Sequence, residues 1–103
     1  MKDDGNLRVD HNAARSRYEL RLGERTVGFM AYRTDSGTQV LAHTEIDPAL
    51  EGRGLGSRLV AMALDDIRSR GLSFVPLCPF VAWYLRQHPE NDDLVAAQPV
   101  GAA

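Results

Sequence analysis

The segment LEGRGLGSRLV (50–60) places closely spaced glycines and basic side chains directly before an amphipathic stretch. Gly52, Gly54 and Gly56 occupy every second position of this segment. The N-terminus of a helix carries unsatisfied N–H groups and about half a positive charge, which attract phosphates. Glycines in the preceding loop let the backbone approach such an anion closely. The segment therefore predicts a phosphate-binding loop that leads into a helix.

Two well-known phosphate-binding motifs do not match this loop. A P-loop has Lys and then Ser or Thr directly after its last glycine, whereas Gly56 is followed by Ser57 and Arg58. A dinucleotide fingerprint has the spacing G-x-G-x-x-G, and Ser57 stands at its third glycine position. A structural alternative is also open, in which the glycines only make a tight connection between a strand and a helix.

Candidate reactive side chains lie on both sides of the loop. His43 and Glu45 are two residues apart in a strand-like run, so they share one face of that strand. Cys78 directly precedes Pro79 at an expected helix N-terminus, where a thiolate is favoured. Three roles are open for Cys78, namely a covalent nucleophile, a proton donor and a buried apolar thiol.

The elements that must position these groups begin with an antiparallel meander. Apolar and polar residues alternate in RYELRL, and two later segments are rich in β-forming residues. Turn chemistry at GER (23–25) and TDSG (34–37) separates the segments. The predicted strands are 17–22, 26–33 and 38–46, with a further edge strand at 7–11.

From Ser57 the apolar period changes to that of a helix, which ends at Gly71. The apolar run LSFVPLC (72–78) predicts a buried strand, reached from the third strand by a crossover. A second helix is expected over 79–88, with Phe80 and Trp83 packed against the core. The buried face of the first helix is expected to be Leu59, Val60, Ala63, Leu64 and Ile67. The predicted fold class is α+β, an antiparallel β-meander followed by a βαβ crossover and a C-terminal helix.

Length and composition indicate one domain over 1–103, with an ordered core at about 7–95. We expect the first six residues and the tail AAQPVGAA to fray. The net charge of −2 argues against binding to nucleic acid or a membrane surface. A lone Cys78, dispersed histidines and the lack of an apolar leader or span predict a cytoplasmic protein without a metal site.

The order of these motifs resembles the GNAT superfamily of acetyl-coenzyme A-dependent N-acetyltransferases. HTEIDPALEGRGLGSRLV (43–60), followed by PLCPFVAWYLRQHPE (76–90), is similar to small single-domain GNAT-like proteins, and the resemblance covers roughly residues 7–95. The family's pyrophosphate loop is Q/R-x-x-G-x-G/A, so Glu51 departs from its first position. A carboxylate would repel a pyrophosphate, and Glu51 is therefore expected to point away.

The resemblance implies that coenzyme A binds with its pyrophosphate on backbone N–H groups of residues 53–57. Its pantetheine arm would lie between the strand ending at Ile46 and the strand ending at Cys78. Arg86 or His88 could touch the 3′-phosphate, although a basic residue at a helix C-terminus is the simpler account. The implied cofactor-binding residues are Thr44, Ile46, Arg53, Gly54, Leu55, Gly56, Ser57 and Arg58.

The resemblance also implies catalytic roles. Glu45 stands where the family often draws its general base, with His43 as an assistant, and Tyr84 where a tyrosine often protonates the departing thiolate. Cys78 falls in the family's cleft, as an acetylated nucleophile or beside the coenzyme A sulfur. Glu45 as a solvated carboxylate, His43 as a residue hydrogen-bonded within the sheet and Cys78 as an inert thiol remain the structural alternatives.

We therefore expect direct transfer of an acetyl group from acetyl-coenzyme A to an unidentified amine, in a monomer or weak homodimer. The chain is shorter than full-length family members, so the resemblance implies an open acceptor side. That openness and Glu51 favour an alternative, a non-catalytic acyl-coenzyme A-binding or interaction module. A hydrolase that uses Cys78 is a third, more distant alternative.

Overall fold

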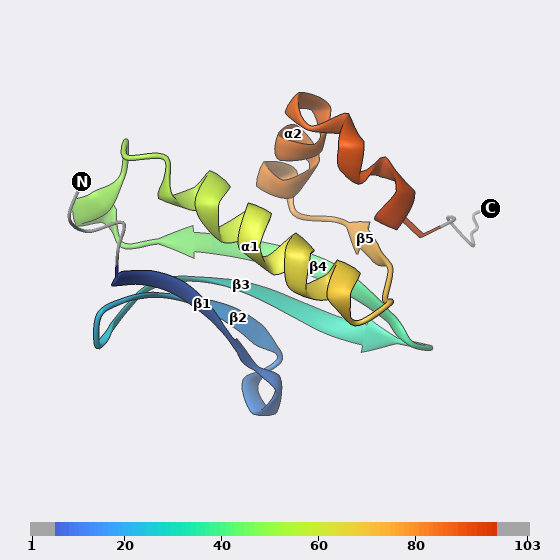
Figure 1. Ribbon diagram of the computed structural model, residues 1–103, viewed down its shortest axis with the longest axis horizontal. Helices are drawn as coiled ribbons and strands as arrows, with labels where there is room; N and C mark the ends of the chain where they lie inside the picture. Colours follow the sequence, from blue (N-terminus) through green and yellow to red (C-terminus); the bar gives the residue numbers. More distant parts are fainter. Residues whose placement is uncertain (1–5, 97–103) are drawn as a thin grey trace.

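Five strands form one sheet in the order β1-β2-β3-β4-β5 in the computed structural model, which describes residues 6–96 (Figure 1). The first four strands are antiparallel neighbours, and β5 is parallel to β4. The strands are β1 Leu7–Asn12, β2 Arg17–Leu22, β3 Arg25–Asp35, β4 Thr38–Ile46 and β5 Phe74–Pro76. The predicted meander with its edge strand is confirmed.

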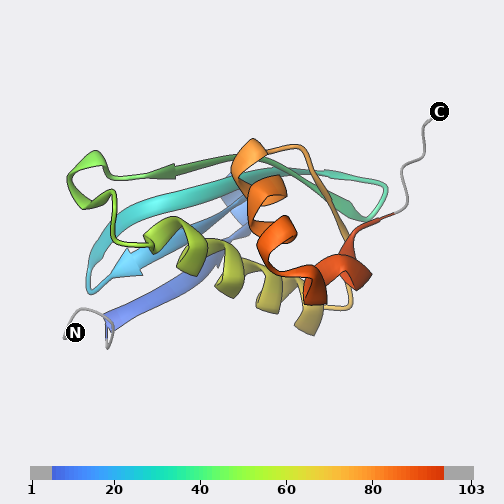
Figure 2. The same ribbon diagram turned by 90° about the horizontal axis from the view of Figure 1, so that it is seen from above.

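Helix α1 (Leu55–Ser69) connects β4 to β5 and completes the predicted βαβ crossover. Helix α2 (Pro79–Gln87) follows β5, and both helices lie on the same face of the sheet (Figures 1 and 2). Short 3-10 turns occur at Ala13–Arg15, Pro48–Leu50 and Pro89–Leu94. No helix within residues 6–96 has the length and apolar character needed to span a membrane. The α+β fold class is thus as the sequence predicts.

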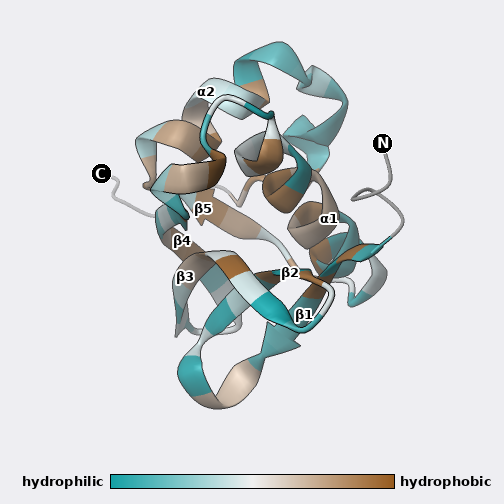
Figure 3. Cartoon of the chain, turned by 90° about the vertical axis from the view of Figure 1, so that its left-hand side faces the viewer, coloured by the Kyte–Doolittle hydropathy of each residue, from teal (hydrophilic) through white to brown (hydrophobic). Residues whose placement is uncertain are grey.

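The core lies between the helices and the sheet. The face of α1 that the sequence predicts to be buried is buried at every position, from Leu59 to Ile67. Hydrophobic positions of the helices turn toward the sheet in Figure 3. Removing each such large apolar side chain from water stabilises the fold by roughly 1.5–3 kcal/mol. The largest sheet residues beneath the helices are Tyr18, Leu20, Met30, Leu41 and Phe74.

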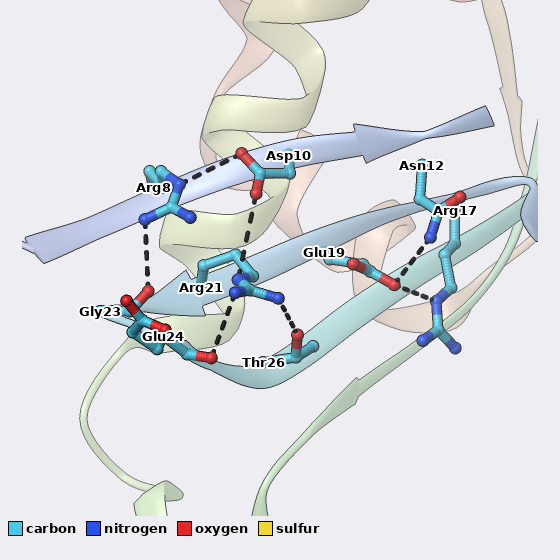
Figure 4. A network of polar contacts seen from close by, with 9 residues as sticks. All are labelled: Arg8, Asp10, Asn12, Arg17, Glu19, Arg21, Gly23, Glu24 and Thr26. Atoms are coloured by element: carbon cyan, nitrogen blue, oxygen red, sulfur yellow. Dashed lines mark hydrogen bonds and ion pairs between the residues drawn. The ribbon is translucent and has the colours of Figure 1, made fainter. Parts of the chain in front are cut away.

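The opposite face of the sheet carries a network of polar side chains (Figure 4). Arg8 and Asp10 on β1 pair with each other, and Arg17 and Glu19 on β2 lie 2.8 Å apart between Nε and Oε2. Arg21 reaches Thr26 on β3 with a hydrogen bond of 2.9 Å. The alternation in β2 predicts this arrangement, with one face of the sheet packed and the other polar.

Several element boundaries differ from the prediction by one or two residues, among them both ends of β3, which is Arg25–Asp35 rather than 26–33. Strand β5 is Phe74–Pro76 rather than 72–78, because Leu77 N already donates to the Val75 carbonyl in a turn that ends the pairing. Helix α1 begins at Leu55, two residues before the predicted start. Gly71 has φ +69° and follows the last turn of α1, as predicted.

The C-terminal part holds one feature that sequence patterns missed. The 3-10 turn Pro89–Leu94 follows α2 and places Leu94 in the core. Ala96, the first residue of the tail expected to fray, donates its N–H to the Phe74 carbonyl at 2.8 Å. The rest of that tail, and residues 1–5, lie outside the described residues.

Candidate cofactor and active site

A gap opens where β4 and β5 separate. The two strands pair only from Gln39 with Phe74 to Leu41 with Pro76, and Cys78 N donates to the Leu41 carbonyl at 2.9 Å. The chain then turns into α2, while β4 continues to Ile46. The end of β4 therefore has a partner strand on the β3 side only.

The register of β3 and β4 decides which backbone groups face this gap. Asp47 N donates to the Val27 carbonyl at 2.8 Å, which makes Glu45 with Phe29 a hydrogen-bonded pair. Alternate residues of a strand direct their N–H and C=O groups to opposite sides. Thr44 and Ile46 therefore direct theirs toward the gap, where an extended ligand could continue the ladder.

The N-terminus of α1 lies beside this gap without a capping side chain. Gly54 is the N-cap residue, with φ +74°, and Gly52 has φ +87°. These left-handed conformations explain why the loop requires glycine at both positions. The first turn contains no acidic residue, so its partial positive charge is available to an anion.

Gly56 has a different purpose from the other two glycines. It lies inside α1 with a helical backbone, and an added Cβ would come within 2.9 Å of Cζ of Phe80. The missing side chain lets the Phe80 ring of α2 pack directly on the first turn of α1. The alternating glycines therefore have two structural roles. Gly52 and Gly54 allow the loop conformation, and Gly56 allows the two helices to pack.

These elements enclose a cavity of about 400 Å³. Six of the eight predicted cofactor-binding residues line it, whereas Arg53 and Arg58 do not belong to its lining. Glu51, which we expected to point away, contributes to the wall. The lining consists of Thr44, Ile46, Leu50, Glu51, Gly52, Gly54, Leu55, Gly56, Ser57, Phe80 and Trp83.

The expectation that Trp83 packs in the core is wrong. Its side chain is 43% exposed, and it stands at the cavity with Phe80. Apolar periodicity in α2 could not reveal this, because the helix is short and only one side of it meets the sheet.

Cys78 lies at the inner end of the gap. Its side chain is buried, and its Sγ is 3.4 Å from Oγ1 of Thr44, which lines the cavity. Cys78 is the N-cap residue of α2, two residues beyond the end of β5 rather than at its last position. The thiol is thus close to the cavity wall without being exposed in it.

Glu45 and His43 lie on the polar face of the sheet, opposite the cavity. Nε2 of His43 is 2.8 Å from Oε2 of Glu45, and both side chains are exposed. The predicted shared face is therefore confirmed. Glu45 lines a smaller hollow of about 240 Å³ on this side, together with Phe29 and Asp47.

Tyr84 is buried within the C-terminal region. Its ring stacks on His88 with centroids 4.1 Å apart, and it does not belong to the cavity lining. Burial raises the pKa of the Tyr84 hydroxyl, with smaller contributions from Glu90 and Asp65. The three catalytic candidates therefore occupy three different surroundings, and Cys78 contacts the cavity lining through Thr44.

The sequence of this chain matches a known family. Residues 17–94 match the profile of the GCN5-related N-acetyl-transferases, and the chain belongs to this family. Relatives include Protein NATD1 of Homo sapiens, 30% identical over 98 residues that cover 90% of this chain and 84% of the relative. Protein NATD1 of Xenopus tropicalis is 28% identical, covering 96% and 93% of the two chains.

A solved structure has the same fold. The NMR solution structure of a GCN5-like protein from Staphylococcus aureus superimposes with a TM-score of 0.66. The match covers 90% of this chain and 91% of that one, at 20% sequence identity. This likeness concerns the fold, since the identity is low.

Proposed function

We propose that this protein transfers an acetyl group from acetyl-coenzyme A to an amine by direct transfer. The observation that carries the proposal is the uncapped N-terminus of α1, which opens into the same cavity as the gap-facing edge of β4. Membership of the GCN5-related family supports it. The cavity offers two different kinds of binding group, as a ligand with a diphosphate and an amide-bearing arm requires.

The residues present fit acetyl-coenzyme A. Backbone N–H groups of Leu55, Gly56 and Ser57 are suited to its diphosphate, since Gly54 has no side chain that could cap them. The backbone of Thr44 and Ile46 is suited to the amides of its pantetheine arm. Bound there, acetyl-coenzyme A would supply the acetyl group in activated form as a thioester. Glu51 in the wall is the one unfavourable charge.

The acceptor amine would be bound on the polar face of the sheet. His43 and Glu45 form a hydrogen-bonded pair there, which can accept the proton that an attacking amine must lose. On the other side of β4, the thiol of Cys78, in contact with Thr44 of the cavity lining, is the candidate to supply a proton to the leaving sulfur. Tyr84 would serve as proton donor only if its buried ring reaches the cavity on cofactor binding.

Calorimetric titration with acetyl-coenzyme A tests binding, and coenzyme A release over an amine library tests transfer. We expect saturable binding. We also expect Glu45→Gln to lower the rate of release by about 10²- to 10⁴-fold, the usual contribution of a general base. The control is Arg33→Gln, which changes an exposed residue of the neighbouring strand β3. Absence of binding at millimolar acetyl-coenzyme A would refute the proposal.

A non-catalytic acyl-coenzyme A-binding module is the second candidate. It is favoured by the position of Glu45 on the face opposite the cavity and by the buried position of Tyr84. Saturable binding without release over any amine, unchanged in Glu45→Gln and Cys78→Ala, would support this candidate. If coenzyme A is released in the absence of any amine, and Cys78→Ala abolishes this release, the protein is instead a hydrolase.

A further inference from the structure

Trp83 is a large aromatic residue placed at the surface. Its side chain is 43% exposed, although burial of a tryptophan is normally favourable. Leu77 is the other large hydrophobic residue that the described part of the chain leaves exposed, at 56%, but it does not belong to the cavity lining. Exposure of Trp83 therefore coincides with a cavity, whereas exposure of Leu77 does not.

A chain of contacts fixes Trp83 relative to the helix N-terminus. Gly56 in the first turn of α1 admits the ring of Phe80, whose Cζ would be 2.9 Å from an added Cβ. Phe80 in turn lies 5.5 Å from Trp83 between ring centroids, with the planes inclined by 34°. One side of the indole is thereby supported by Phe80, and Trp83 is held at the same cavity as Gly54 and Ser57.

The cavity thus combines three binding chemistries. The first turn of α1 suits a diphosphate, the edge of β4 suits amide groups, and Trp83 offers an exposed aromatic surface. Aromatic side chains bind flat nucleobases by stacking, and they do so without reading the base by hydrogen bonds. An amide-bearing arm is better served by the backbone of Thr44 and Ile46 than by an indole ring.

We propose that Trp83 is a stacking platform for the adenine ring of the donor, and that the protein therefore selects a donor that carries its thioester on a nucleotide. The inference rests on the proposed function, since it assigns one end of acetyl-coenzyme A to one wall of the cavity. A phosphopantetheine thioester attached to a carrier protein has no base to place on Trp83. Such a donor binds more weakly here than coenzyme A.

Trp83 is the only tryptophan of the chain, so intrinsic fluorescence reports on this position alone. The probes are coenzyme A, adenosine 3′,5′-bisphosphate and 4′-phosphopantetheine. We expect saturable quenching with the two adenine-containing probes and no quenching with 4′-phosphopantetheine. Quenching by 4′-phosphopantetheine without quenching by adenosine 3′,5′-bisphosphate would overturn the inference, because Trp83 would then contact the arm.

Calorimetry on variants provides the second measurement. We expect Trp83→Leu to weaken coenzyme A about tenfold, which corresponds to about 1.4 kcal/mol and lies within the range of base stacking. The affinity for 4′-phosphopantetheine should stay within about twofold, and Trp83→Phe should retain most of the coenzyme A affinity. Leu77→Ala is the matched control, an exposed apolar residue of the same region outside the cavity.

The outcomes separate this inference from the proposed function. If the wild type binds coenzyme A and Trp83→Leu binds it equally well, Trp83 is not the platform and the proposed function stands. If Leu77→Ala weakens binding as much as Trp83→Leu does, the effect is not specific to the cavity and the inference fails. If the wild type binds no coenzyme A, both fail together. Circular dichroism of each variant verifies folding.

Discussion

The two ends of α1 are built in opposite ways. At the C-terminus, Gly71 N donates to the Arg68 carbonyl and Leu72 N to the Ile67 carbonyl, the two bonds of a Schellman motif. Arg68 also pairs with Asp93 at 2.8 Å, beyond the helix. At the N-terminus, Gly54 provides no capping side chain, and the first turn lacks acidic residues.

This difference shows where the molecule gives up stability. A capping side chain at the position of Gly54 would contribute about a few tenths of a kcal/mol relative to glycine, which this helix forgoes at the end that opens into the cavity. The C-terminal end of α1, called here the closed end because its last carbonyls are hydrogen-bonded, faces the His11–Tyr18 region. Polar groups in that region already have protein partners. One helix end thus serves the fold, and the other remains available to a ligand.

The largest effect is expected from closing the open end. Ser57→Glu places a carboxylate in the first turn of α1, where it should stabilise the helix by roughly 0.3–1 kcal/mol and repel a diphosphate. We expect a higher Tm together with at least a tenfold loss of coenzyme A affinity by calorimetry. Ser57→Gln is the neutral control. Undiminished affinity in Ser57→Glu would show that the diphosphate does not bind at this helix end.

Opening the closed end should affect stability alone. Gly71 has φ +69° with no atom within 4 Å of an added Cβ, so the cost of Gly71→Ala is purely conformational. We expect a loss of about 1 kcal/mol in the free energy of unfolding, measured by denaturation, and a Tm lower by roughly 4–8 °C. A parallel fall in coenzyme A affinity would contradict the independence of the two helix ends.

The closed end should also give a pH-dependent contribution to stability. Nε2 of His11 lies 2.6 Å from the Tyr32 hydroxyl, and its ring stacks on Tyr18. Burial lowers the pKa of His11 below 6.5; Arg70 lowers it further, and Asp66 opposes both. The unfolded chain therefore binds more protons in the acid range, so stability is full above pH 6.5 and falls as the pH drops below it.

Denaturant unfolding at pH 7.5, 6.5 and 5.5 measures this contribution. We expect the wild type to lose stability over this range and His11→Gln to lose less, because it has no imidazole to protonate. An identical slope in both proteins would assign the pH dependence to other groups. Coenzyme A affinity at pH 7.5 should be the same in both.

The smallest effect is expected from an exposed ion pair at the closed end. Nε of Arg70 lies 2.6 Å from Oδ2 of Asp66, one turn earlier in α1. Because exposed pairs contribute little, Arg70→Gln should lower Tm by less than Gly71→Ala does. A larger shift would mean that the Coulombic contacts of Arg70 with His11 and the tyrosines matter more than its pairing with Asp66.

Much of the fold could be predicted from local patterns. The alternation in RYELRL gave β2 within its observed bounds, and the glycine at position 71 marked the end of α1 correctly. Boundaries failed where tertiary contacts decide them, as at β5, whose three residues are defined by their pairing with β4. Sequence patterns did not predict the turn Pro89–Leu94, because a single buried leucine produces no hydrophobic periodicity.

The candidate site was predictable in part. The spacing of Gly54 and Gly56 before an amphipathic helix located the cavity correctly, since both line it. Residue type alone could not distinguish Gly54, which needs a positive φ, from Gly56, which makes room for Phe80. Whether a substrate can contact Glu45, Cys78 or Tyr84 depends on the directions of these side chains in the folded protein. Local sequence patterns do not specify these directions.

The sequence by itself determined the order of strands and helices, the buried face of α1 and the membership of a family, because periodicity, turn chemistry and motif spacing are properties of neighbouring residues. Only the tertiary structure decided that β4 and β5 separate beyond Leu41, that Glu45 and the cavity lie on opposite faces of the sheet, and that Trp83 is exposed. These features arise from the packing of segments distant in the chain, where the space left by one residue, as at Gly56, sets the position of another.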